Sequence, residues 1–325
     1  MYKVELKTTS FSVGNFTSYF IAKSVYTLAN TATITVYRKD YAELTAFKKR
    51  LQRNLPVQLL IDGELVLSGI IAEISPEYRR GIPCLTVKIN SPASKMVDAS
   101  ISTGKIYLKQ TAAAIAADIV SGFGLEFSYT GNRQDIIPEF VVSACDLADI
   151  VLNQLAQISN RLIYSAADGR VIMEDKCSSK KTASALITGE NIIDIYKYDN
   201  VYNQFSAVCL HNQQPLKDEL ALESIVDNSL TGQSQGTGRE KHLTADILNL
   251  TALNGQIQEF EESCFEFRVV GSSFKDTENN IFKLNRPIIV KDSWIEADGT
   301  FRIARIELSG SEEAYTAALD LEELA

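Results

Sequence analysis

Residues 57–76 read VQLLIDGELVLSGIIAEISP, and this stretch decides the fold of the first part of the chain. Segments 57–61 and 65–74 are rich in aliphatic and β-branched residues, which favours two strands. The dipeptide Asp62-Gly63 between them is a strong signal for a two-residue hairpin, because both of its turn positions need a positive φ. The segment therefore predicts an antiparallel hairpin.

The sequence on either side of this hairpin extends the strand pattern. Residues 31–36 alternate threonine with apolar side chains, as a half-buried strand does. Residues 76–83 are polar and predict a turn, and residues 84–89 predict another strand. One helix is expected at 41–52. Short strands separated by turn signals predict that residues 1–91 form an antiparallel β-barrel or β-sandwich.

Residues 92–185 have a different character and predict a small α+β domain. Two segments carry apolar side chains at helical spacing, and Asp146 is expected to be the N-cap of the second. One apolar face is expected for that second helix, formed by Leu147, Ile150, Val151, Leu155 and Ile158. The expected elements are helices at 111–121 and 146–160 and strands at 125–129, 161–165 and 170–174, the last two joined by a turn at 166–169.

Residues 186–325 return to strand character and predict a second β-rich domain. This domain is expected to carry a long polar insertion near 211–262. Within the insertion, residues 220–226 predict an edge strand and residues 245–262 a helix. Long polar connections of this kind are uncommon inside compact domains. Later strands are expected at 264–270, 287–290, 301–308 and 315–321. The pattern predicts a mainly β fold in which two β-rich domains flank a small α+β domain.

Composition excludes several kinds of function. The 325 residues carry a formal net charge of −9, which does not suit a surface that holds nucleic-acid phosphates. The basic group Lys48, Lys49, Arg50 and Arg53 fits the solvated face of the helix at 41–52. Leu44, Phe47 and Leu51 would form the buried face of that helix. No apolar run is long enough to cross a bilayer, and the charged start has no signal peptide, so folding in the cytoplasm is expected.

The residues that usually carry catalysis or metal binding are few and scattered. The five cysteines form no CxxC motif and are expected to be buried thiols: Cys84, Cys145, Cys177, Cys209 and Cys264. His211 and His242 are the only histidines and are expected in surface or loop positions. No catalytic residue, cofactor site or metal site is therefore predicted, and the protein is not expected to be an enzyme.

Carboxylates and the single tryptophan give no stronger signal for chemistry. A glycosidase needs two facing carboxylates, but Glu259, Glu261 and Glu262 are expected in water on a helix. Two further pairs, Glu312-Glu313 and Glu322-Glu323, fit turn and terminal charges. Trp294 is expected to pack in a loop or at the rim of a sheet rather than to bind sugar.

The hairpin segment 57–76 resembles a recurrent stretch of the Mu-like phage tail P proteins, which are baseplate hub proteins. Segments 26–36, 88–100, 146–175 and 189–193 are similar to other parts of that family, in the same order along the chain. The sequence departs from the family in the Gln- and Gly-rich stretch at 211–242. The colinear order of the segments is the stronger signal, because Asp-Gly hairpins occur in many proteins.

The resemblance implies a structural hub of a contractile tail. In that family each chain brings two similar antiparallel β-barrels that resemble tail-tube domains, and the resemblance implies them here at residues 1–91 and 186–325, flanking the α+β domain. Family members form a homotrimer whose six barrels make a pseudo-sixfold ring, which joins the sixfold tail tube protein to the trimeric central spike protein. The implied location is the tail baseplate of the virion, after assembly in the cytoplasm of the host bacterium, in contact with other baseplate proteins. DNA would pass the central channel without specific binding, and the acidic charge would repel it.

Three other functions stay open at this stage. A tail-tip or receptor-binding β protein would expose aromatic patches and bind a host glycan or protein. A cell-wall hydrolase of the tail would need a carboxylate pair in a cleft. The hub of a phage-like contractile injection system would have the same fold as a phage hub. The residues that form contacts between subunits are not indicated by the sequence.

Overall fold

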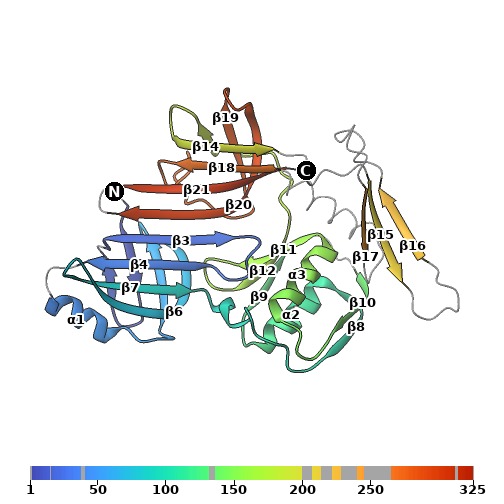
Figure 1. Ribbon diagram of the computed structural model, residues 1–325, viewed down its shortest axis with the longest axis horizontal. Helices are drawn as coiled ribbons and strands as arrows, with labels where there is room; N and C mark the ends of the chain where they lie inside the picture. The colour runs from blue at the N-terminus through green and yellow to red at the C-terminus, as the bar shows by residue number, and fades with distance from the viewer. Residues whose placement is uncertain are drawn as a thin grey trace.

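The computed structural model describes residues 2–14, 16–37, 41–131, 136–199, 207–213, 222–227, 240–244, 265–311 and 314–324. Figure 1 shows three parts: N-terminal strands in blue, a green α+β part, and C-terminal strands in yellow to red. The blue and red strands belong to one large sheet, whose strands are almost all antiparallel. The predicted fold class, mainly β with an α+β part between two similar β modules, is confirmed.

The N-terminal module is a curled antiparallel sheet with one helix. Its strand order is β3-β4-β7-β6-β5-β1-β2. The strands are β1 (Val4–Lys7), β2 (Ser12–Gly14), β3 (Ser18–Ser24), β4 (Thr31–Tyr37), β5 (Pro56–Ile61), β6 (Glu64–Arg79) and β7 (Ile82–Asn90). The helix predicted at 41–52 is present as α1 (Tyr41–Arg50), in which Leu44 is buried as expected and Phe47 is partly buried. Leu51, also buried, follows the end of the helix.

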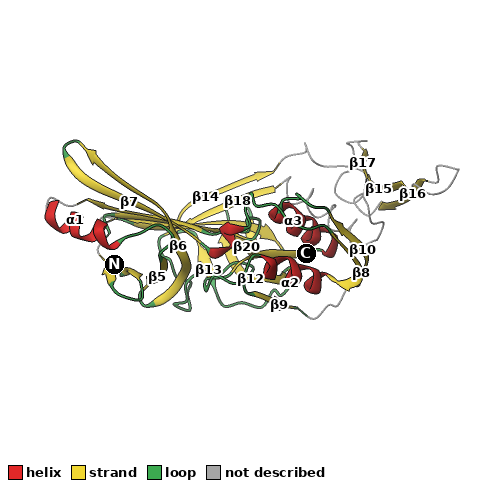
Figure 2. Cartoon of the chain, turned by 90° about the horizontal axis from the view of Figure 1, so that it is seen from below, coloured by secondary structure: helices red, strands yellow, loops and turns green. Residues whose placement is uncertain are grey.

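The turn predicted at residues 76–83 is present but much shorter than expected. β6 and β7 continue through this segment, and only Arg80 and Gly81 connect them, with φ of 51° and 80°. Two positive φ values are typical of the tight hairpin turn that matches strand twist. The polar residues misled the prediction because this part of the hairpin is exposed on both faces. Figure 2 shows the hairpin projecting at one end of the molecule.

The middle part packs two helices against two small sheets. Its elements are η1 (Pro92–Lys95), β8 (Lys105–Thr111), α2 (Ala112–Gly122), β9 (Phe127–Thr130), β10 (Ile136–Val142), α3 (Ala148–Ser159), β11 (Arg161–Ser165) and β12 (Val171–Asp175). Thr111 caps α2 by accepting a hydrogen bond from the Ala114 N–H. The helices and their sheets share a separate apolar core. The predicted helices and the hairpin at 161–174 are confirmed.

Two details of the second helix differ from the prediction. α3 begins one residue after Leu147, and the Asp146 carboxylate accepts a hydrogen bond from the Ser143 N–H instead of capping the helix. Ile150 is 48% exposed, because the buried face runs through Val151, Leu152 and Leu155. The start of the helix lies two residues later than predicted, at Ala148, and Ile150 lies outside the buried face.

The C-terminal module supplies the remaining strands of the large sheet. They are β13 (Ala185–Ile187), β14 (Ile192–Asp199), β18 (Phe265–Gly271), β19 (Pro287–Asp292), β20 (Ala297–Ser311) and β21 (Tyr315–Glu323). Between β14 and β18, a separate sheet has the order β16-β15-β17. Its strands are β15 (Ala207–Gln213), β16 (Leu222–Asp227) and β17 (Glu240–Thr244), so the edge strand expected at 220–226 is present. The helix expected at 245–262 lies outside the described residues.

The two β modules have the same connectivity. The order β3, β4, β5, β6, β7 in one corresponds to β14, β18, β19, β20, β21 in the other. In both, the first strand pairs with the second, the second with the fifth, and the fourth with the third and the fifth. The module is therefore present twice in one chain.

The correspondence extends to the register of the long hairpins. β6 carries an irregularity between Ile71 and Glu73, and β20 carries one between Ile303 and Arg305. Beyond it, Glu73 faces Lys88 in one hairpin as Arg305 faces Asp320 in the other. A bulge bends a strand and strengthens its twist, so the shared position gives both hairpins the same curvature.

The two modules meet edge to edge through β20 and β3. These antiparallel strands pair over seven residues, from Arg305 opposite Ser24 to Ser311 opposite Ser18. The pairing produces one uninterrupted antiparallel run of eight strands, β14-β18-β21-β20-β3-β4-β7-β6. Figure 1 shows β3 and β20 side by side. The apolar residues of both modules consequently form a single core.

Candidate functional site: the polar face of the shared sheet

The eight-stranded run has one apolar face and one polar face. Val269, Ile306 and Leu319 are fully buried in the shared core. The residues next to them in sequence, such as Arg268 and Glu307, point to the opposite face because side chains alternate along a strand. The polar face is therefore the broad surface that both modules build together.

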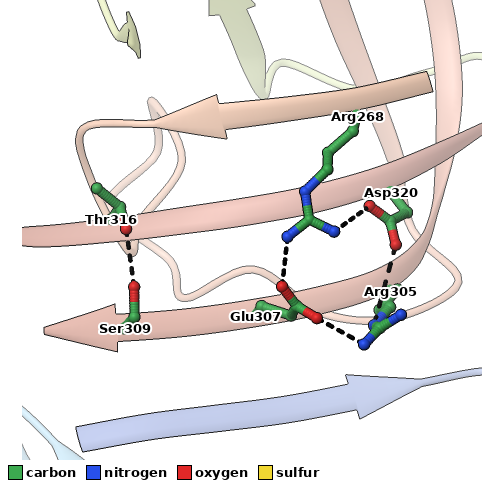
Figure 3. A network of polar contacts seen from close by, with 6 residues as sticks. All are labelled: Arg268, Arg305, Glu307, Ser309, Thr316 and Asp320. Atoms are coloured by element: carbon green, nitrogen blue, oxygen red, sulfur yellow. Dashed lines mark hydrogen bonds and ion pairs between the residues drawn. The ribbon is translucent and has the colours of Figure 1, made fainter. Parts of the chain in front are cut away.

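A closed network of four charges lies on this face in the C-terminal module (Figure 3). The Arg268 guanidinium donates to Glu307 and, at 3.0 Å, to Asp320. Arg305 lies 2.6 Å from the other Glu307 oxygen and 3.9 Å from Asp320. Beside this network, the Ser309 and Thr316 hydroxyls are hydrogen-bonded at 2.8 Å. Each arginine thus bridges two carboxylates contributed by β20 and β21.

The N-terminal module has a smaller counterpart at the corresponding positions. Lys88 Nζ lies 2.8 Å from Glu73 Oε2, and the Ser75 hydroxyl donates to the other oxygen at 2.6 Å. These hydrogen bonds from Lys88 and Ser75 lower the pKa of Glu73. Near the tip of the hairpin, Arg79 pairs with Glu77 at 2.7 Å. In both modules the charges of this face are balanced within local pairs.

The structure corrects the prediction for Glu322. It was expected to be a terminal charge, but it lies in β21 and pairs with Arg302, whose side chain is almost completely buried. Tyr26 also donates a hydrogen bond to Glu322. Removing either charge would leave the other without its partner in a low-dielectric interior, so this contact is structural.

Trp294 lies in the connection between β19 and β20, so its predicted loop position is confirmed. Its side chain is 90% exposed, so the expected packing is wrong. The basic group at Lys48, Lys49, Arg50 and Arg53 is exposed as predicted.

The cysteines and histidines give a mixed outcome. Cys84 is buried as predicted, but Cys145 is exposed and Cys177 is intermediate. Cys145 lies in a loop with φ of 76°, where no sheet or helix covers it. His211 lies within β15 and His242 within β17, so the loop alternative of the prediction is wrong and the surface alternative stays a prediction. Glu259, Glu261, Glu262, Glu312, Glu313 and Cys264 lie outside the described residues.

No chemical centre emerges from the described residues. Among them, no group of three or more His, Cys, Asp or Glu side chains is arranged to hold a metal ion. Likewise, no helix in the described part of the chain is long and apolar enough to span a membrane. The polar face is the feature that sequence reasoning missed, because its charges come together only through the pairing of distant strands.

Solved structures of phage tail proteins share this fold. A tail protein of prophage MuSo2 from Shewanella oneidensis superposes with a TM-score of 0.82 at 17% identity, covering 99% of this chain and 98% of that one. A tail protein from Neisseria meningitidis MC58 gives 0.84 at 15% identity, with 99% and 96% covered. An E. coli component of the type VI secretion system gives 0.64 at 10% identity, with 98% and 77% covered.

These likenesses establish a fold that extends over nearly the whole chain. At such low identity the likeness concerns architecture and not individual side chains. No protein-family model and no curated protein sequence matches the chain. The resemblance to the Mu-like phage tail P proteins therefore stays a prediction at the level of the family.

Proposed function

We propose that the protein is a non-enzymatic structural hub of a phage tail baseplate. In this proposal three chains form a ring, and each contributes two copies of one β module. Six similar modules then match the sixfold tail tube, while the true threefold symmetry matches a trimeric central spike. The hub would work in the virion, next to other baseplate proteins, after assembly in the host bacterial cytoplasm.

The observation that supports this proposal is the duplicated module within one continuous sheet. The β20–β3 junction already joins two equivalent modules through main-chain pairing. Repeating the same junction between chains adds modules with a constant rotation, and cyclic closure stops the growth. Edge-strand pairing suits this task because main-chain hydrogen bonds need little sequence specificity.

The polar face suits the lumen of such a ring. Its arginines and lysine are each held by carboxylates, so the wall presents few cations that could bind DNA phosphates. The acidic net charge of the sequence predicts that the channel repels DNA. The pairing of each cation with a carboxylate gives a second physical reason why DNA would pass without specific binding.

Native mass spectrometry tests this function directly. The purified chain, alone and mixed with tail tube and spike proteins, is expected to form a species containing three copies. A chain that stays monomeric in every mixture would contradict the hub proposal.

Two specific observations favour alternative functions. The likeness to a type VI secretion component supports the hub of a contractile injection system as an alternative. Tail genes in the genomic neighbourhood distinguish a phage from such a system. The exposed Trp294 favours a receptor-binding tail protein. Saturable binding to host cells that is lost in Trp294→Ala would support that second function.

A further inference from the structure

We infer that the projecting part of β6, residues 74–79, pairs with β14 of a second copy of this chain, in the register of the β20–β3 junction. This inference rests on the proposed ring, and it names the surfaces and residues that would close it. The second copy is the neighbouring copy in that ring.

The two strands are the ends of the eight-stranded run. Among the described residues, β14 pairs along its length with β18 alone. β5 pairs with β6 only up to Ile70, so the part of β6 beyond the bulge pairs with β7 alone. By the module correspondence, this part of β6 is equivalent to the part of β20 that pairs with β3, and β14 is equivalent to β3.

The equivalence fixes the register residue by residue. Lys88 corresponds to Asp320, so the residues before them, Val87 and Leu319, also correspond, as do their partners Ile34 and Val269. Tyr19 faces Ile34 and Ile195 faces Val269, so Ile195 takes the place of Tyr19. Tyr78 takes the place of Gly310, because it follows Glu73 at the same spacing as Gly310 follows Arg305.

Gly310 and Tyr19 are partners at the internal junction, so the external junction places Tyr78 opposite Ile195 of the neighbouring copy. Because the two strands run antiparallel, the same register places Glu77 opposite Tyr196 of the neighbouring copy. It also places Arg79 opposite Asp194 of the neighbouring copy.

The chemistry of the two edges is complementary in this register. Tyr78 is 67% exposed, and an isoleucine directly opposite would form an aromatic and β-branched cross-strand pair. Arg79 already pairs with Glu77 and donates to the Tyr37 hydroxyl at 2.7 Å, and the exposed Asp194 of the neighbouring copy would add a second carboxylate beside it. Tyr196 and Tyr198 are 49% and 42% exposed on β14. The pairing would cover large side chains that a single copy leaves in water.

Pro76 removes one main-chain hydrogen bond from the proposed junction. Arg79 and Ile82 flank the two-residue turn and form a hydrogen-bonded pair. Hydrogen-bonded pairs alternate along the ladder, so the N–H and C=O groups of Arg79 and Glu77 point toward β7. The position of Pro76 then faces the outer edge, where its missing N–H leaves the β6–β7 ladder intact. The junction between copies would have one donor fewer than the internal junction.

Disulfide trapping tests the register. Glu77 and Tyr196 of the neighbouring copy would form a non-hydrogen-bonded pair, whose Cα atoms lie about 4.5 Å apart and can be bridged. The variant Glu77→Cys/Tyr196→Cys is compared with Glu77→Cys/Tyr198→Cys, whose diagonal separation of about 7–8 Å disfavours a bridge. Both carry Cys145→Ser, because Cys145 is exposed. Single-cysteine variants give the background.

The outcomes separate the register from the hub proposal. Oxidation of the matched pair is expected to yield a covalent trimer, and the shifted pair only background. A trimer in native mass spectrometry without preferential trapping of the matched pair would overturn the register and leave the hub proposal standing. A monomer that traps neither pair, even mixed with tube and spike proteins, would overturn both.

A second variant avoids engineered cysteines. Tyr78→Asp is expected to weaken each junction by roughly fivefold, because it removes the cross-strand contact with Ile195 of the neighbouring copy. The exposed Trp294→Asp is the matched control, since its side chain lies outside the proposed junction. Equal trimer dissociation constants for both variants, with unchanged unfolding curves, would count against the junction.

Discussion

Replacing Lys23 by methionine should stabilise the protein at neutral pH. Lys23 lies on β3 opposite Ile306, at the junction of the two modules, and its side chain is buried. Burial lowers the pKa of its ammonium group from 10.5 to about 8, even though Glu64 nearby favours the charged form. Lys283 also lies close enough to oppose the charge. Methionine keeps the apolar stem and removes the ammonium group.

The magnitude follows from linkage between protonation and folding. The unfolded chain keeps the ordinary lysine pKa, so between pH 8 and 10.5 it binds more protons than the folded chain, and stability rises with pH in that window. Below pH 8 the charged Lys23 costs the folded state about 3 kcal/mol. Lys23→Met should therefore raise the free energy of unfolding at pH 7 by up to about 3 kcal/mol.

Urea unfolding at a series of pH values between 7 and 11 measures this difference. The gain of Lys23→Met over the natural chain should be largest at pH 7 and should shrink steadily above pH 8. The exposed Lys95→Met is the control and should show no such trend. A gain that is absent at pH 7, or that grows with pH, would refute the assignment of a desolvated Lys23.

Three other predictions concern stability. Glu322→Ala should destabilise the fold by about 3–5 kcal/mol in denaturant unfolding, because it leaves the buried Arg302 without its carboxylate partner. The double variant with Arg302→Met should recover most of the lost stability. No recovery in the double variant would contradict a charge effect. Gly310→Ala should cost about 1–3 kcal/mol, since the added Cβ would overlap the Tyr19 ring, and adding Tyr19→Val should relieve it. Hydrogen bonds from Lys105 and Tyr107 lower the pKa of Asp118, so the ionised carboxylate stabilises the fold at neutral pH and this stabilisation is lost as acid protonates it. In Asp118→Asn, the free energy of unfolding should therefore fall less between neutral and acidic pH than in the natural chain.

Local sequence patterns predicted the elements well where one face is buried. The hairpin at Asp62-Gly63, helix α1 and the hairpin at 161–174 follow from alternation, turn residues and helical spacing, all of which are local. The failures have local reasons too. The projecting end of β6–β7 has no buried face, so its polar residues had the pattern of a turn, and the Asp146 side chain bonds back to Ser143 instead of capping α3.

The candidate site could not be predicted from the sequence in the same way. Arg268 lies more than thirty residues from Glu307 along the chain, and only the order of β18, β21 and β20 brings them together. The duplication was proposed through a family resemblance, because the two modules share connectivity and bulge position more clearly than residues. The duplication can therefore be recognised from the topology of the strands and not from the amino-acid composition.

The mass of the assembled protein tests the central claim most directly. Native mass spectrometry of the 35.9 kDa chain with its tube and spike partners should show a complex that contains three copies. A complex that holds six copies, or a single copy under all conditions, would contradict a ring in which each chain supplies two of six equivalent modules.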